Sequence, residues 1–173
     1  MKKLTVLKFP NPLLAKKSQP VHDYDQSLTD LAKAMLHTMY EEGGIGLAAP
    51  QVGQHRRLIV VDVRDGEGEE EEDIRNPAFY VNPRIVEQSG EVITEEGCLS
   101  VVEFTAEVKR AQAITLEYET TEGETRQEKM TDLKAVCVQH EIDHLDGKLF
   151  IDHLPQLKRQ MVKKKLAKIA RSA

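Results

Sequence analysis

Apolar residues recur along this chain at two spacings, which predict helices towards its ends and strands in its middle. Four of them follow helical spacing before Gly43-Gly44: Leu28, Leu31, Met35 and Met39. We therefore predict a helix over residues 27–42, with a capping box that starts at Ser27 and reaches Asp30.

The middle of the chain consists of short β-branched runs separated by turn residues. Glu122-Gly123 is typical of a hairpin turn, whereas residues 9–21, which contain three prolines, predict an extended and irregular lead-in. Residues 65–73 are mostly acidic, and like charges of this density predict a solvated loop. Strands are predicted at 58–63, 79–88, 91–94, 101–109, 111–119 and 125–130.

Two further helices are predicted after the last strand. Thr131 or Asp132 caps the first, which ends at Gly147 and is expected to bury an apolar face made of Leu133, Val136 and Cys137. The second, from about 155 to 170, is strongly basic. Strands clustered between helices predict an α+β fold, with mostly antiparallel strands packed around the helix that ends at Gly147.

Composition narrows the class of protein. A chain of 173 residues, 40% hydrophobic and 31% charged, fits one soluble domain spanning 1–173, with residues 155–173 as its basic C-terminal helix. The net charge of -5 argues against a DNA-coating protein. Two cysteines do not indicate a disulfide scaffold, and the apolar runs are too short for a signal peptide or a membrane helix. We therefore expect a cytoplasmic protein that does not enter membranes.

The strongest chemical signal is the pentapeptide His140-Glu141-Ile142-Asp143-His144, in the helix that ends at Gly147. Residues four apart lie on one helix face, so both histidines are placed to hold one metal ion. Such an ion would lower the pKa of its bound water from about 15.7 towards ~7 and make that water the nucleophile, with Glu141 as general base. The sequence therefore indicates a metal-dependent hydrolase.

A catalytic site of this kind needs a third protein ligand. Cys98 is the best candidate, because it follows a glycine in Glu96-Gly97-Cys98-Leu99-Ser100. The other histidines have no comparable context: His22, His37, His55 and His153. A Cys/His/His set suits Fe(II), Zn(II), Ni(II) or Co(II), and its chemistry does not choose among them.

An oxyanion site is expected from the glycine-rich segment of residues 44–51. Its glycines allow a substrate backbone to come close, and Gln51 offers a neutral amide donor to a tetrahedral intermediate. The segment has no phosphate-loop lysine, so a nucleotide site is not indicated.

Three segments together resemble the peptide deformylase family: 44–51, 96–100 and 139–144, in that family's order and spacing. The resemblance implies removal of the formyl group from N-formyl-methionine of new polypeptides, with release of formate. It implies Cys98, His140 and His144 as ligands of one ion, natively Fe(II), with Zn(II) or Ni(II) also bound. It implies Glu141 as general acid/base, and Gln51 and the Leu99 N–H as oxyanion donors.

The resemblance also implies substrate-binding positions. Gly46 and Gly97 would approach the substrate backbone, whereas the methionine pocket would be formed by Ile45, Leu133, Val136, Cys137 and His140. Two positions depart from the family pattern: Val102 stands where many members have proline, and Thr105 stands where they have a substrate-facing arginine. The departure concerns how residues beyond methionine are held, and it leaves the chemistry intact.

Two rival functions share the same motif. A general metallopeptidase would cleave internal or unformylated peptides, for which this short chain offers little room. A closed structural metal site would need a fourth ligand, with Cys137 or Asp143 nearest along the helix. The basic helix over 155–170 is either a solvated face or, as the resemblance implies, a surface that docks on the ribosome.

Overall fold

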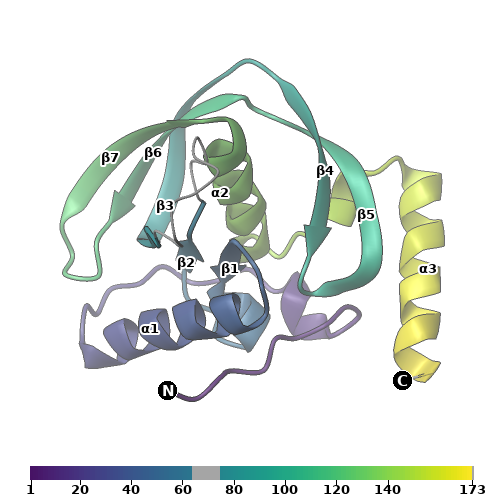
Figure 1. The fold of residues 1–173 in the computed structure, drawn as a ribbon, viewed down its shortest axis with the longest axis horizontal. Helices are drawn as coiled ribbons and strands as arrows, with labels where there is room; N and C mark the ends of the chain where they lie inside the picture. The colour runs from purple at the N-terminus through teal and green to yellow at the C-terminus, as the bar shows by residue number, and fades with distance from the viewer. Residues whose placement is uncertain (64–74, 173) are drawn as a thin grey trace, which may run out of the picture.

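The structure is a computed structural model that describes residues 1–63 and 75–172. The predicted acidic loop at 65–73 lies outside the described residues. Figure 1 shows the arrangement of the helices and strands. They are α1 (Gln26–Glu41), β1 (Gly46–Ala48), β2 (Leu58–Val61), β3 (Ala78–Ser89), β4 (Val92–Cys98), β5 (Val101–Arg110), β6 (Ala113–Glu119), β7 (Thr125–Thr131), α2 (Asp132–Leu145) and α3 (Gln156–Ser172), with short 3-10 helices at Pro12–Ala15, Ala49–Val52 and Phe150–His153.

The strands form two antiparallel sheets. One has the order β1-β2-β3-β6-β7, and the other is the hairpin β4-β5. Helices α1 and α2 pack on opposite faces of the larger sheet. Side chains alternate between these faces along β2, so neighbouring residues of β2 contact different helices. Leu58 and Val60 join the buried cluster of α1, whereas Ile59 and Val61 join that of α2. The two faces together explain why all of β2 is buried.

The β4–β5 hairpin has a separate apolar cluster. Val101 and Val108 of β5 pack with Phe150, and with Val162 and Leu166 of α3. Figure 1 shows α3 beyond β5, at the side of the molecule away from β7. This packing fixes the hairpin that carries Cys98 at its end. Among the described residues, none of the helices combines the length and hydrophobicity that crossing a membrane requires.

The end of α2 is as predicted. Gly147 follows the helix with φ of +76°, and its N–H donates to the carbonyl of His144 at 3.1 Å. A Cβ at this glycine would run into the carbonyl of Ala15. The helix thus ends at Leu145, and Gly147 lets the chain pass close to the lead-in segment.

Several boundaries differ from the prediction. The N-cap of α1 is Asp25, whose carboxylate accepts from the Leu28 N–H at 3.2 Å, while Ser27 donates to Asp25 instead of capping. Strand β4 continues to Cys98, because β5 pairs with it over that length. Sequence reasoning missed β1, three residues inside the glycine-rich segment. The prediction that Leu133 belongs to the buried face of α2 is wrong: Leu133 is 53% exposed, because it lies in the first turn of α2 at the mouth of the cavity described below.

Candidate metal centre and active site

Helix α2 and strand β4 bring three ligand-type side chains together. His140 and His144 are one turn apart on α2, and Cys98 is the last residue of β4. Their ligand atoms all lie within 4.8 Å of one another, and this group of three could hold a metal ion. The His144 Nε2 atom lies 3.4 Å from Cys98 Sγ and 3.2 Å from His140 Nε2. A sulfur and two imidazole nitrogens that converge in this way fit a divalent transition metal.

The two imidazoles have different surroundings. His140 Nδ1 is 2.8 Å from Glu96 Oε1, so its Nε2 faces the cluster. Burial alone would lower the pKa of His140, but hydrogen bonds with Cys98 and Glu96 raise it to about 10. Burial lowers the pKa of His144 well below its usual range, and its Nδ1 is buried without a hydrogen-bond partner among the described residues. His144 is therefore the neutral member of the pair.

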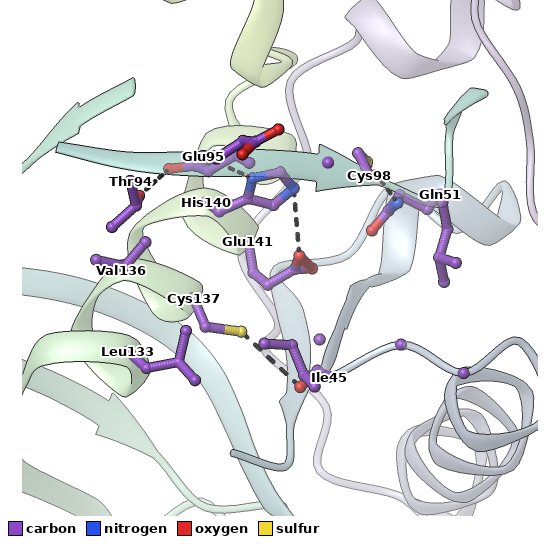
Figure 2. Close-up of a pocket in the computed structure, with 16 residues that line it drawn as sticks. Ile45, Gln51, Thr94, Glu95, Cys98, Leu133, Val136, Cys137, His140 and Glu141 are labelled. Atoms are coloured by element: carbon purple, nitrogen blue, oxygen red, sulfur yellow. Dashed lines mark hydrogen bonds and ion pairs between the residues drawn. The ribbon is translucent and has the colours of Figure 1, made fainter. Parts of the chain in front are cut away.

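Glu141 lies beside this cluster and points into the adjoining space (Figure 2). It is 3% exposed, and its Oε1 atom lies 3.7 Å from His140 Nε2. Its Oε2 atom has no hydrogen-bond partner among the residues that the structure describes. Burial raises the pKa of Glu141 to about 7, with His140 opposing the shift. A buried carboxyl group of this kind is suited to both accepting and donating a proton near neutral pH.

A cavity of about 440 Å³ opens in front of Glu141. Figure 2 shows Ile45 on one wall and the start of α2 on another. Cys137 donates weakly towards the Ile45 carbonyl, with a sulfur-to-oxygen distance of 3.8 Å. The predicted methionine pocket is brought together here, since all of its members line the cavity: Ile45, Leu133, Val136, Cys137 and His140.

Gly46 and Gly97 both line this cavity, but they differ in how closely they are packed. A Cβ at Gly46 would lie 2.8 Å from Cys137 Sγ and 3.0 Å from Glu141 Cγ. A Cβ at Gly97 would meet only Thr105, at 3.4 Å. Gly46 therefore lets β1 come close to α2 itself, which is a constraint that the sequence did not reveal.

Gln51 and Leu99 lie at the metal-ligand end of the cavity. Gln51 Oε1 accepts from the Ala48 N–H at 2.9 Å, which fixes the amide, and Nε2 donates to Ser100 Oγ at 3.1 Å and to Cys98 Sγ at 3.6 Å. Leu99 is in the turn between β4 and β5, and its carbonyl accepts from Lys8 Nζ. An oxyanion would therefore have to share the Gln51 amide with Cys98 or Ser100.

A buried charge network supports the histidines from behind. Arg110 is 6% exposed and donates to both oxygens of Glu96, which also contacts His140. The Nη1 atom of Arg110 donates to Asp143 Oδ2 at 2.7 Å, and His153 Nε2 lies 2.7 Å from the same oxygen. Sequence reasoning left the role of Asp143 open and missed Arg110, because neither strand register nor hairpin twist can be deduced from spacing.

The other histidines and cysteine are outside the metal-ligand group. His153 pairs with Asp143, and His55 Nε2 lies 2.9 Å from the Leu13 carbonyl. Cys137 faces Ile45, and the group of possible ligands among the described residues contains neither His22 nor His37.

Comparison with known proteins gives a consistent result over nearly the whole chain. The sequence profile described as polypeptide deformylase matches residues 3–160. Peptide deformylase 2 of Xanthomonas axonopodis pv. citri is 48% identical over 95% of both chains, and the peptide deformylase of Pseudoalteromonas translucida is 44% identical over 100% of this chain and 99% of its own. The crystal structure of peptide deformylase from Ehrlichia chaffeensis in complex with actinonin has a TM-score of 0.89 and 37% identity, covering 99% of both chains.

Proposed function

The chain belongs to the polypeptide deformylase family, and from that premise we propose how its own residues bind and hydrolyse a formylated substrate. Its activity is that of a metal-dependent hydrolase that removes formyl groups. The substrate that we assign is the N-formyl-methionyl end of a newly made polypeptide, and the products are formate and a free amine. The observation that carries the residue assignments is the meeting of Cys98, His140 and His144 beside Glu141.

We assign the metal to Cys98, His140 and His144, natively as Fe(II), with Zn(II) or Ni(II) as substitutes. A bound divalent ion supplies Lewis acidity and lowers the pKa of water at the site. The thiolate and the two imidazoles hold the ion, and Glu96 orients His140 through its Nδ1–H. Arg110 in turn fixes Glu96 with two hydrogen bonds.

Proton transfer is assigned to Glu141. Its Oε2 atom, which has no hydrogen-bond partner among the described residues, takes a proton from the attacking water and later gives it to the leaving nitrogen. The Gln51 amide and the Leu99 N–H donate to the oxygen of the tetrahedral intermediate. Cleavage of the carbon–nitrogen bond then leaves a free amine and formic acid, and the proton that formic acid loses on becoming formate protonates the amine.

We assign substrate binding to the cavity next to Glu141. The methionine side chain fits the apolar wall formed by Ile45, Leu133, Val136 and Cys137, which His140 completes. The backbones of Gly46 and Gly97 border the path of the peptide. We also propose that residues 1–173 form one catalytic domain; the packing of α2 against the larger sheet supports this.

A structural metal site is disfavoured by the contacts of the remaining candidates. Cys137 faces the Ile45 carbonyl, and Asp143 is engaged by Arg110 and His153. Neither belongs to the ligand group that the described residues form. The cavity beside the group is what an open, catalytic site requires.

The test of the proposed function is formate release. The protein should be purified anaerobically, loaded with Fe(II), and supplied with formyl-Met-Ala-Ser. We expect formate with an intact Met-Ala-Ser peptide. Cleavage between Met and Ala without formate would instead indicate a metallopeptidase and contradict the proposal.

We further propose a cytoplasmic location, in keeping with two cysteines that are not joined to each other, and a contact between α3 and the ribosome. The α3 helix exposes Lys164, Lys165 and Lys168, while its Val162 and Leu166 are buried. Replacing the three lysines by glutamine leaves the packing intact and should weaken salt-sensitive ribosome binding. Unchanged binding would contradict this contact.

A further inference from the structure

Strand β4 presents a free edge to the active-site cavity. Among the described strands, β4 pairs with β5 alone, and five of its consecutive residues, Thr94 to Cys98, border the cavity. Side chains alternate between faces along a strand, so a continuous run of this kind marks an edge and not a face. Glu141 lines the same cavity, and its Oε2 atom has no partner within the part of the chain that the structure describes, which is a separate sign that a ligand is received here. An extended peptide can add to such an edge as a further strand.

The two faces of β4 differ in chemistry. Glu96 is buried and contacts His140 of α2, whereas Ile93, Glu95 and Gly97 alternate with it along the strand and are exposed. Residues opposite each other on neighbouring strands point to the same face. A peptide whose methionine enters the apolar cavity therefore projects its next side chain outwards, beside Glu95 and Gly97. Because Gly97 has no side chain, Glu95 supplies the contact.

Glu95 carries a charge that no cation neutralises in an ion pair within the described residues. Its Oε1 atom accepts from the hydroxyl of Thr105 at 2.8 Å, which is a neutral partner. Glu107 lies directly opposite it in the β4–β5 register, and Lys109 on that strand pairs with Glu91. Two opposed glutamates destabilise a hairpin, so the position of Glu95 at the cavity rim, opposite Glu107, is not explained by folding.

We propose that Glu95, reinforced by Glu107, selects formyl-methionyl peptides with a lysine or arginine immediately after the methionine. The inference rests on the proposed function and specifies its substrate class. Exposed ion pairs are weak, so we expect about 3- to 10-fold higher kcat/KM for a lysine than for a glutamate at this position. Salt at about 1 M should remove most of the difference by screening.

The test compares formyl-Met-Lys-Ala, formyl-Met-Gln-Ala and formyl-Met-Glu-Ala as substrates of the full-length, metal-loaded protein, with formate release as the readout. Glu95→Gln should bring the ratio of kcat/KM for the lysine peptide to kcat/KM for the glutamate peptide near one, and Glu95→Lys should lower this ratio below one. Glu122→Gln is the matched control, since Glu122 is exposed in the β6–β7 turn and carries the same charge.

Four results would be decisive. A wild-type ratio near one, or a ratio that Glu95→Gln leaves unchanged, would overturn the role of Glu95 while leaving the deformylase activity in place. A loss of preference in Glu122→Gln equal to that in Glu95→Gln would overturn it as well, because net charge and not position would then be responsible. Failure to release formate from all three peptides would overturn the proposed function itself and this inference with it.

Discussion

Arg110 donates from Nε and Nη2 to the two carboxylate oxygens of Glu96, at 2.9 Å each. The pair is buried, with side chains 4% and 7% exposed, and it connects two ligand-bearing elements. Glu96 contacts His140 and precedes Cys98 by two residues, whereas Asp143, the second partner of Arg110, precedes His144 by one. Arg110 therefore fixes β4 relative to α2 at the point where the three proposed ligands meet.

Replacing Arg110 by methionine should affect both folding and metal binding. The change leaves the Glu96 carboxylate buried without its cation, and we expect the free energy of unfolding to fall by about 3–5 kcal/mol. Loss of the support behind His140 should weaken metal binding about 10- to 100-fold. Denaturant unfolding and metal titration measure the two effects.

Arg84→Met is the matched control for this substitution. Arg84 pairs with Glu117 at 2.8 Å, but its side chain is 70% exposed, so the expected loss is below about 1 kcal/mol. Equal losses in Arg84→Met and Arg110→Met, with metal affinity unchanged in both, would show that the buried network does not position the ligands.

Gly46→Ala should disturb the active site through packing. The added Cβ would lie 2.8 Å from Cys137 Sγ and 3.0 Å from Glu141 Cγ, so β1 or α2 must shift. We expect a loss of about 1–3 kcal/mol in the free energy of unfolding and a fall in kcat, because Glu141 is displaced. At Gly97, where the Cβ meets only Thr105 at 3.4 Å, alanine should leave stability nearly unchanged. Equal stability of the two variants would refute the close approach at Gly46.

The two cysteines allow a paired test of the ligand assignment. Cys98→Ala should lose most bound metal after dialysis, because two imidazoles alone hold an ion weakly. Cys137→Ala should keep it, since Cys137 lies against the Ile45 carbonyl and outside the ligand group. Metal analysis of the purified variants is the measurement. A metal content in Cys98→Ala close to that of the wild type would remove Cys98 from the site.

Metal binding should also depend on pH. Hydrogen bonds with Cys98 and Glu96 raise the pKa of His140 to about 10, so the metal-free protein keeps a proton on this imidazole at neutral pH. Because a ligand histidine must be neutral, the metal has to displace that proton. Affinity should thus rise as pH rises towards the raised pKa and fall as the solution becomes more acidic. Zinc titrations in weakly buffered solution should detect released protons; a pH-independent affinity between pH 6 and 9 would contradict the assignment.

Periodicity and motif spacing predicted much of this molecule. Helical spacing from His140 to His144 fixed their common face, and a glycine-flanked Cys98 pointed to the remaining member of the cluster, which the fold brings within 4.8 Å of both histidines. Apart from β1, the order of helices and strands also followed from local pattern. Such features depend on residues close in sequence.

Contacts between distant residues could not be predicted in the same way. The Arg110–Glu96 contact joins two strands whose pairing register shifts between Glu96 and Cys98. This register shift cannot be predicted from the pattern of residues in the sequence. The packing of Gly46 on Cys137 depends on how closely β1 approaches α2. At Thr105, the sequence indicated a departure from the family pattern, and the structure adds its hydrogen bond to Glu95.

Glu141→Gln tests the central claim most directly. Glutamine has nearly the same shape, so the variant should fold and bind metal like the wild type, but it cannot accept and return a proton. We expect the rate of formate release from formyl-Met-Ala-Ser to fall by about 10²- to 10⁴-fold, with equal metal content in both proteins. Formate release at the wild-type rate by metal-loaded Glu141→Gln would contradict the account.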